Sequence, residues 1–349
     1  MLSPLNVLLS IRRAQKARKA GASHCDYMPH RLIVETSSVC NLRCPMCPAS
    51  QRVGIPTGQM KFDTFKRVID QAASFVSLVD LSHRGEPLSN RNLPAMIAYA
   101  DERRIATGLS SNATRLTEEL ALRLISSGLN SITFSVDGLE RDTYERIRVG
   151  ARFHEVIENI INFLKMKRRL RSRTPLTTIE ALDLPDAPIS EEKARRFLRN
   201  FRSLPLDSFV VKSPHTWAGS IELNQGDRTV SSTGDSYYAC PFIWSTMVVL
   251  WDGSVSLCPQ DWYNDNPLGS AHDSTLEEMW NGWTLTFVRQ LVGSREYNQI
   301  EVCSQCDLLW RPAGSQPRIP TSRGLILHNS SGLERIKRRL LPISRLLEE

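Results

Sequence analysis

Hydrophobic and polar positions along this chain alternate in a repeating order. From residue 30 onward, short apolar runs are each closed by a polar loop and followed by a stretch with helical spacing. The apolar runs are predicted to be strands at residues 31–35, 78–82, 105–110, 131–135, 176–182 and 208–212. The stretches between them are predicted to be helices at 62–75, 93–103, 117–126, 153–169 and 191–201.

This alternation predicts an α/β fold in which crossover helices connect the strands of a parallel sheet. Six such units suit an open sheet or a partial (β/α)6 barrel of the TIM type. In these folds the chemistry gathers in the loops at the carboxyl ends of the strands. We therefore expect the functional residues to follow the strands.

The alternation stops after about residue 220, where a different architecture begins. Asp252-Gly253 lies between two short apolar runs and predicts a β-hairpin, because this dipeptide suits the positive φ values of a two-residue turn. Ser274 and Glu277 form a capping-box pattern that predicts a helix running towards Leu291.

Four segments follow from these changes of pattern. We predict a basic N-terminal helical extension (1–29), an α/β core (30–220), a small auxiliary domain with a hairpin and a helix (221–316), and a basic tail with a helix at 333–347 (317–349). The extension is expected to pack on the main domain, and a helix lying on a membrane surface is the alternative.

Composition and charge narrow the class of protein only slightly. Hydrophobic residues make up 41% and charged residues 23% of the 349, which is ordinary for a globular protein. The net charge of +7 is concentrated near the two ends and fits a solvated basic face, so no nucleic-acid partner is expected. There is no apolar run of about 20 residues and no secretory signal pattern, so we predict a cytoplasmic protein without a transmembrane segment.

A reducing compartment changes the meaning of the eight cysteines, because disulfides are rare there and clustered thiols become candidate metal ligands. Cys40, Cys44 and Cys47 form C-x3-C-x2-C directly after the first predicted strand. Three thiolates leave one iron of a four-iron cubane open to a small ligand. Structural zinc is the alternative, but it prefers four ligands, and no histidine or fourth cysteine follows closely.

This spacing resembles the hallmark of the radical S-adenosylmethionine (SAM) superfamily. The resemblance implies that a [4Fe-4S] cluster on the three cysteines chelates SAM and cleaves it to a 5′-deoxyadenosyl radical. Further motifs follow the next three strands in the family's order: Gly85-Glu86-Pro87, then Ser110 and Asn112 with Ala113 where the family usually has glycine, then Ser135-Val136-Asp137-Gly138. The resemblance implies SAM contacts from Gly85, Glu86, Pro87, Ser110, Asn112, Ser135 and Asp137.

A second set of cysteines, spaced C-x17-C-x44-C-x2-C, lies beyond the core at Cys240, Cys258, Cys303 and Cys306. Four thiolates close a coordination sphere, which fits either zinc or a fully ligated iron–sulfur cluster. With the hairpin and helix around it, this region resembles the SPASM/twitch domains of radical SAM enzymes. The family resemblance is closest to 2-deoxy-scyllo-inosamine dehydrogenase-like enzymes, and it implies one auxiliary [4Fe-4S] cluster.

The resemblance implies a radical SAM oxidoreductase that dehydrogenates an alcohol to a ketone and passes an electron to the auxiliary cluster. The expected partners are a small sugar, cyclitol or nucleoside, in secondary metabolism such as antibiotic biosynthesis, and an external one-electron reductant such as flavodoxin or ferredoxin. The base that removes the hydroxyl proton is not identifiable from spacing.

Several alternatives stay open. A radical epimerase needs a thiol that returns hydrogen to the substrate, and Cys25 is the cysteine left over. Arg84 precedes Gly85, and as a catalytic residue its guanidinium could grip a carboxylate, which would suit decarboxylation of an acidic sugar. A peptide-modifying maturase and a non-enzymatic zinc-binding interaction module are the other two possibilities.

Overall fold

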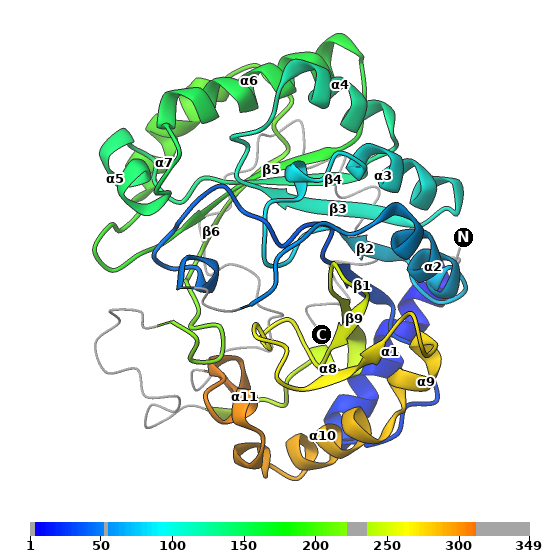
Figure 1. Cartoon of the computed structure of the whole chain (residues 1–349). Helices are drawn as coiled ribbons and strands as arrows, with labels where there is room; N and C mark the ends of the chain where they lie inside the picture. Colours follow the sequence, from blue (N-terminus) through cyan, green and yellow to red (C-terminus); the bar gives the residue numbers. More distant parts are fainter. Residues whose placement is uncertain (1–3, 52–54, 222–235, 312–349) are drawn as a thin grey trace.

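The computed structural model describes residues 4–51, 55–221 and 236–311 (Figure 1). Its centre is a parallel sheet in which six strands lie in sequence order. The bounds are β1 Arg31–Val34, β2 Leu78–Asp80, β3 Ala106–Ser111, β4 Ser131–Ser135, β5 Leu176–Leu182 and β6 Ser208–Lys212. The predicted parallel α/β sheet is confirmed.

Helices cover one face of this sheet (Figure 1). Their bounds are α2 Phe62–Ala72, α3 Leu93–Glu102, α4 Glu118–Ser126, α5 Arg141–Ile147, α6 Phe153–Arg169 and α7 Glu191–Leu198. Burial alternates along β4, β5 and β6, because every second side chain packs under the helices while its neighbours face the half-accessible inner side. The short helix α5 was not predicted from the sequence.

The C-terminal region extends the same sheet. Strand β8 (Thr246–Val249) pairs in parallel with β1, and β9 (Ser254–Ser256) and β10 (Pro267–Ser270) follow it antiparallel. The predicted hairpin is confirmed, with Gly253 at a φ of 91° in its turn. Two smaller strands, β7 (Ser236–Tyr237) and β11 (Trp310–Arg311), pair with each other, and α11 (Glu301–Ser304) lies just before β11 along the chain.

The predicted capping box is wrong by one residue. Thr275 is the cap: its Oγ1 accepts from the Glu278 amide at 3.1 Å, and the Glu278 carboxylate accepts from the Thr275 amide at 2.8 Å. The Ser274 amide instead donates to the Ser270 carbonyl and completes the preceding turn. The predicted single helix is also two helices, α9 (Leu276–Trp280) and α10 (Trp283–Gly293), which Gly282 separates.

The N-terminal helix is present as α1 (Pro4–Ala20), but it packs on the C-terminal region, where it contacts α8 (Phe242–Ser245). Gly21 and Gly293 let the backbones meet, because a Cβ on Gly293 would lie 2.8 Å from the Gly21 Cα. The predicted helix at 333–347 lies outside the described residues. Among the helices that are described, none combines the length and apolar character that a membrane span requires.

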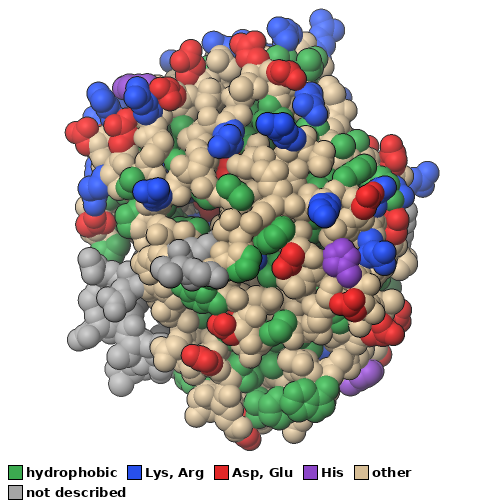
Figure 2. Space-filling model, in the orientation of Figure 1, with side chains coloured by type: hydrophobic (Ala, Val, Ile, Leu, Met, Phe, Trp, Pro, Cys, Tyr) green, Lys and Arg blue, Asp and Glu red, His purple; other side chains and the backbone are tan. Residues whose placement is uncertain are grey.

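The surface in Figure 2 carries Lys, Arg, Asp and Glu side chains intermixed over the upper half, where α4 to α7 lie. Hydrophobic side chains gather at the lower edge over α10. Trp283 and Phe287 stack there with a ring-centroid distance of 5.2 Å, and Trp283 is 78% exposed. On this face neither sign of charge forms a continuous patch of its own.

Candidate active site between two cysteine sets

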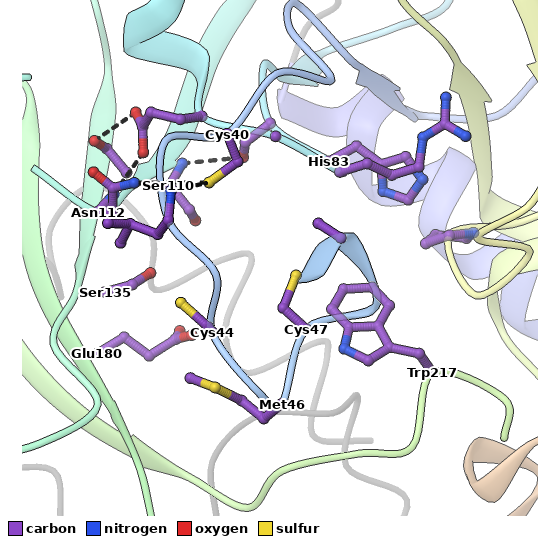
Figure 3. A pocket seen from close by; sticks show the side chains of 18 of the residues that line it. Cys40, Cys44, Met46, Cys47, His83, Ser110, Asn112, Ser135, Glu180 and Trp217 are labelled. Carbon is purple, nitrogen blue, oxygen red and sulfur yellow. Dashed lines mark hydrogen bonds between the residues drawn. The ribbon is translucent and has the colours of Figure 1, made fainter. Parts of the chain in front are cut away.

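A cavity of about 450 Å³ lies against the carboxyl ends of the parallel strands, within the range of small-molecule sites. Figure 3 shows side chains from the cysteine loop and the strand ends pointing into it. Most residues predicted for the site line this cavity: Cys40, Cys44, Cys47, Arg84, Gly85, Glu86, Ser110, Asn112, Ser135 and Asp137. Pro87 does not line it and is buried as the first residue of a short 3-10 helix.

The three thiols of the first set surround a common space (Figure 3). Cys44 is buried, whereas Cys40 and Cys47 are partly accessible. The Cys47 amide donates to the Cys44 carbonyl at 3.0 Å, which closes a tight turn between them. Burial raises the pKa of Cys44 to about 11; the Arg148 guanidinium opposes the rise, and the neighbouring thiols add to it. A bound metal is therefore what would hold these groups as thiolates at neutral pH.

The donor chemistry of the first set fits an iron–sulfur cluster. Its three thiolates can each bind one iron of a cubane, which leaves the fourth iron open to a small ligand. A structural zinc ion prefers four ligands.

Glu86 joins the segment after β2 to the end of β3. Its buried carboxylate accepts hydrogen bonds from the Ser111 hydroxyl at 2.8 Å and from the amides of Asn112 at 2.8 Å and Leu88 at 3.0 Å. Burial raises the pKa of Glu86, and these donors oppose the rise. The Glu86 amide donates to the Val39 carbonyl of the cysteine loop, so one residue connects three segments of the site.

Gly85 allows a close approach between that segment and the cysteine loop. A Cβ at this position would lie 2.3 Å from the Ser37 carbonyl oxygen and 2.6 Å from the Ser38 carbonyl carbon. No side chain fits there, since both neighbours are backbone atoms. The Gly-Glu-Pro motif is therefore placed where it supports the cysteine loop.

The end of β3 also contacts the cysteine loop. The Asn112 side-chain amide donates to Asn41 Oδ1 at 3.2 Å and lies 4.0 Å from the Cys40 sulfur. Ala113, which stands where the family usually has glycine, has a φ of 59°. This left-handed backbone explains the family's glycine, and alanine adopts it here at some conformational cost.

Asp137 follows β4 and is buried against Arg148, with which it forms an ion pair. Burial raises the pKa of Asp137, and the Arg148 guanidinium opposes the rise. Arg148, at the end of α5, lines the cavity and lies near Cys44. Sequence reasoning missed this arginine, since it belongs to no motif.

The four cysteines of the second set are buried in the C-terminal region. Cys240, Cys258, Cys303 and Cys306 are each at most 8% exposed. Burial raises the pKa of Cys258 well above its ordinary value, and the three other thiols are close enough to raise it further. Burial likewise raises the pKa of Cys303 to about 12. Pro259 and Gln260, which follow Cys258, line the cavity and so bring this set to its edge.

Arg84 lines the cavity, but its guanidinium is already engaged. Nε and Nη2 donate to the two carboxylate oxygens of Glu35 at 2.7 and 2.9 Å, and Nη1 donates to the Trp262 carbonyl at 3.0 Å. Glu35 is completely buried at the end of β1. A substrate carboxylate could bind the guanidinium bidentately only along one of two edges. Protein atoms already occupy both of these edges.

Other lining residues were not predicted. Glu180 at the end of β5 forms an ion pair with Lys212, and His215 and Trp217 follow β6. Only their position along the sequence could have indicated that they line the site, because each lies near the carboxyl end of a predicted strand. Cys25 does not line the cavity; it is 2% exposed, and its thiol contacts the Tyr27 hydroxyl.

Known proteins share both parts of this arrangement. Residues 34–187 match the radical SAM superfamily, and residues 240–307 match the iron–sulfur cluster-binding domain called SPASM. The chain therefore carries a radical SAM domain followed by a SPASM domain. These two domains imply SAM and iron–sulfur clusters as cofactors.

Among individual relatives, the chain is 28% identical over 120 residues to the AdoMet-dependent heme synthase of Methanosarcina barkeri. That match spans only 34% of either chain. This chain is also 23% identical over 320 residues to the tungsten-containing aldehyde ferredoxin oxidoreductase cofactor-modifying protein of Pyrococcus furiosus. That match covers 79% of this chain and 87% of the relative.

Two solved structures show the same fold at 16% sequence identity. BtrN in complex with AdoMet and 2-DOIA has a TM-score of 0.55, with 86% of this chain and 100% of that chain covered. Streptococcus suis SuiB bound to precursor peptide SuiA has a TM-score of 0.62, with 80% and 70% covered. The predicted radical SAM fold with a C-terminal SPASM region is thereby confirmed.

Proposed function

We propose that this protein is a radical SAM dehydrogenase that oxidises an alcohol of a small, polar, ring-shaped substrate to a ketone. The cavity carries this proposal, because it lies between the two cysteine sets. Cys40, Cys44 and Cys47 line it, and so do Pro259 and Gln260 next to Cys258. A substrate held there would contact both cluster-bearing segments.

We infer two [4Fe-4S] clusters, one on each cysteine set, with SAM at the first. When bound, these groups supply the one-electron chemistry: abstraction of a hydrogen atom and an acceptor for the remaining electron. The chain itself positions them. Gly85 and Glu86 support the cysteine loop through backbone contacts, and the ends of β3 and β4 present Ser110, Asn112, Ser135 and Asp137 to the same cavity.

Oxidation of an alcohol also releases the hydroxyl proton, so a base must face the substrate. The lining carboxylates that could accept it are Asp80, which pairs with Arg31, and Glu180, which pairs with Lys212. We assign the proton acceptor to this pair of carboxylates.

Epimerisation and decarboxylation each depended on one particular residue, and neither residue is available to a substrate in the cavity. Epimerisation would require a thiol beside the substrate, yet Cys25 packs against Tyr27 and Asn281 outside the cavity. Decarboxylation of an acidic sugar relied on Arg84, and Glu35 and Trp262 already bind that guanidinium. Dehydrogenation needs neither residue.

A peptide-modifying function is the second candidate. It is favoured by the likeness to SuiB, whose solved structure holds a precursor peptide, and the curated relatives include PqqA peptide cyclases. Here the substrate would be a peptide side chain that reaches the same cavity.

The test is anaerobic reconstitution with iron and sulfide, followed by incubation with SAM, a reductant and a candidate substrate. About eight irons per chain are expected for two cubanes. Formation of 5′-deoxyadenosine with a product that has lost two hydrogens would support dehydrogenation. An unchanged mass with deuterium uptake from solvent would indicate epimerisation, and loss of carbon dioxide would indicate decarboxylation. Cys44→Ala is the inactive control.

A further inference from the structure

The loop after β6 holds an aromatic side chain in the cavity at a conformational cost. Trp217 and Ala218 have φ values of 52° and 53°, and Gly219 follows at 83°. Non-glycine residues adopt this left-handed backbone rarely, and such positions cluster at ligand-binding sites. The sequence contains one glycine in this turn, so the two residues before it adopt the unfavourable conformation without glycine's freedom.

Contacts with the segment of the second cysteine set keep the loop in place. The Thr216 amide donates to Asp307 Oδ2 at 3.1 Å, and the Ile221 amide donates to the Thr216 carbonyl at 3.1 Å. A Cβ on Gly219 would lie 2.8 Å from the Gln305 Cβ, so the loop is packed tightly against the residues between Cys303 and Cys306. The conformation of Trp217 is thus determined by tertiary packing.

The Trp217 ring projects towards the space that the three cysteines surround (Figure 3). Its centroid lies 4.4 Å from that of His215 and 5.0 Å from that of Trp262, which meets it edge-on at 72°. Trp262 is 1% exposed and packs edge-on against the Trp217 ring. Trp217 itself stays partly accessible, so it presents an aromatic surface to the cavity.

The charges around this surface are already compensated. Each lining arginine has a carboxylate partner: Arg31 pairs with Asp80, Arg84 with Glu35 and Arg148 with Asp137. Within the part of the chain that the structure describes, the lining therefore offers no unpaired cation to a phosphate or carboxylate. Gln260 also lines the cavity and is 5% exposed, and its Oε1 has no hydrogen-bond partner among the described residues.

We propose that Trp217 is the stacking platform of the substrate subsite. It takes the apolar face of a neutral or amine-bearing polyhydroxylated ring, while Gln260 accepts a hydrogen bond from a hydroxyl or amino group of that ring. The inference rests on the proposed function, because it assumes that the substrate occupies this cavity. An aromatic face suits the C–H side of such a ring, and the ring attracts a nearby ammonium group.

The test measures binding rather than turnover. The reconstituted protein with SAM is titrated anaerobically by calorimetry with 2-deoxy-scyllo-inosamine as the amine-bearing probe and with glucuronate as the acidic probe. Trp217→Ala is expected to weaken binding of the aminocyclitol about tenfold, with Trp217→Phe retaining most of the affinity. Gln260→Leu is expected to weaken it about fivefold. Trp283→Ala, an exposed tryptophan on α10, is the matched control and should bind like the wild type.

Iron content should stay unchanged in all four variants, which separates loss of the platform from loss of fold. The proposal is overturned if Trp217→Ala binds like Trp283→Ala, if glucuronate binds more tightly than the aminocyclitol, or if the wild type binds neither. Weakened binding in Trp217→Ala together with no loss of two hydrogens would keep the subsite and reject dehydrogenation. Loss of two hydrogens from the substrate together with unaltered binding in Trp217→Ala would support dehydrogenation and reject the subsite.

Discussion

Replacing Arg84 by methionine tests how the radical SAM and SPASM domains are joined. Arg84 follows β2 in the core, and its guanidinium binds Glu35 through two oxygens and the Trp262 carbonyl of the SPASM region. The Trp251 amide also donates to Glu35 at 3.2 Å. One buried ion pair therefore connects the end of β1 to two segments of the C-terminal region.

The expected magnitude follows from burial. The side chains of Arg84 and Glu35 are 4% and 0% exposed. Removing the guanidinium leaves a buried carboxylate without its counter-ion, which typically costs about 3–5 kcal/mol of unfolding free energy. The double variant Glu35→Gln/Arg84→Met buries no charge and should recover about half of that loss.

The loss should also depend on pH. Burial alone would raise the pKa of Glu35, but the Arg84 hydrogen bonds and charge, with His83 and the Trp251 amide, hold it below its ordinary value. Because the folded pKa lies below the unfolded one, this stabilisation is complete above a pH of about 4.3 and disappears as the pH falls through the folded pKa. The difference between wild type and Arg84→Met should therefore shrink on acidification.

The assay is anaerobic guanidinium unfolding of the reconstituted protein at neutral and at acidic pH. Arg195→Met is the control, since Arg195 pairs with Glu191 on the surface and should contribute no more than about 1 kcal/mol. If Arg84→Met loses no more stability than this control, or loses the same amount at both pH values, the reasoning is refuted.

Further predictions concern the cysteine loop and the separate roles of the cysteines. Gly85→Ala should lose about half of the bound iron, because its Cβ would overlap backbone atoms of the cysteine loop. Cys258→Ala should also lose about half of the iron while the protein still cleaves SAM, whereas Cys44→Ala should abolish cleavage. Cys25→Ala should retain the full iron content and turnover, with a stability loss of about 1 kcal/mol from its packed site.

Iron analysis and 5′-deoxyadenosine formation check all of these. Gly108→Ala is the control for Gly85→Ala, because its Cβ would meet a serine hydroxyl that can rotate away. Full iron content in Gly85→Ala would contradict the close approach described above. A Cys25→Ala variant with normal iron but no product would instead revive a thiol that donates hydrogen to the substrate.

The sequence by itself determined the parallel sheet and the first cysteine loop. Short apolar runs alternating with helical stretches predict a parallel sheet with crossover helices, whereas the strand order from β1 to β6 is known from the pairings in the structure. C-x3-C-x2-C after the first strand placed three thiols at a strand's carboxyl end, where the cavity lies. These features depend on local spacing, which a sequence records completely.

The sequence determined the helix boundaries in the C-terminal region less well. Thr275 and Ser274 are both capping residues, each with a glutamate three positions later. The choice between them depended on whether the Ser274 amide was already bonded to Ser270. The break at Gly282 between α9 and α10 likewise does not follow from periodicity alone, since both helices present apolar residues to the same core.

Only the tertiary structure decided what Arg84 and Trp217 contact. Their partners lie far along the chain: Glu35 and Trp262 for Arg84, and Trp262 again for Trp217. From the sequence alone, an arginine beside a binding motif is interpreted as a ligand contact. The structure shows instead that a buried carboxylate binds it. Which buried charges neutralise one another, and which aromatic face remains open, depends on how β8 and the loop after Cys258 pack against β1 and β2, and no local pattern encodes that packing.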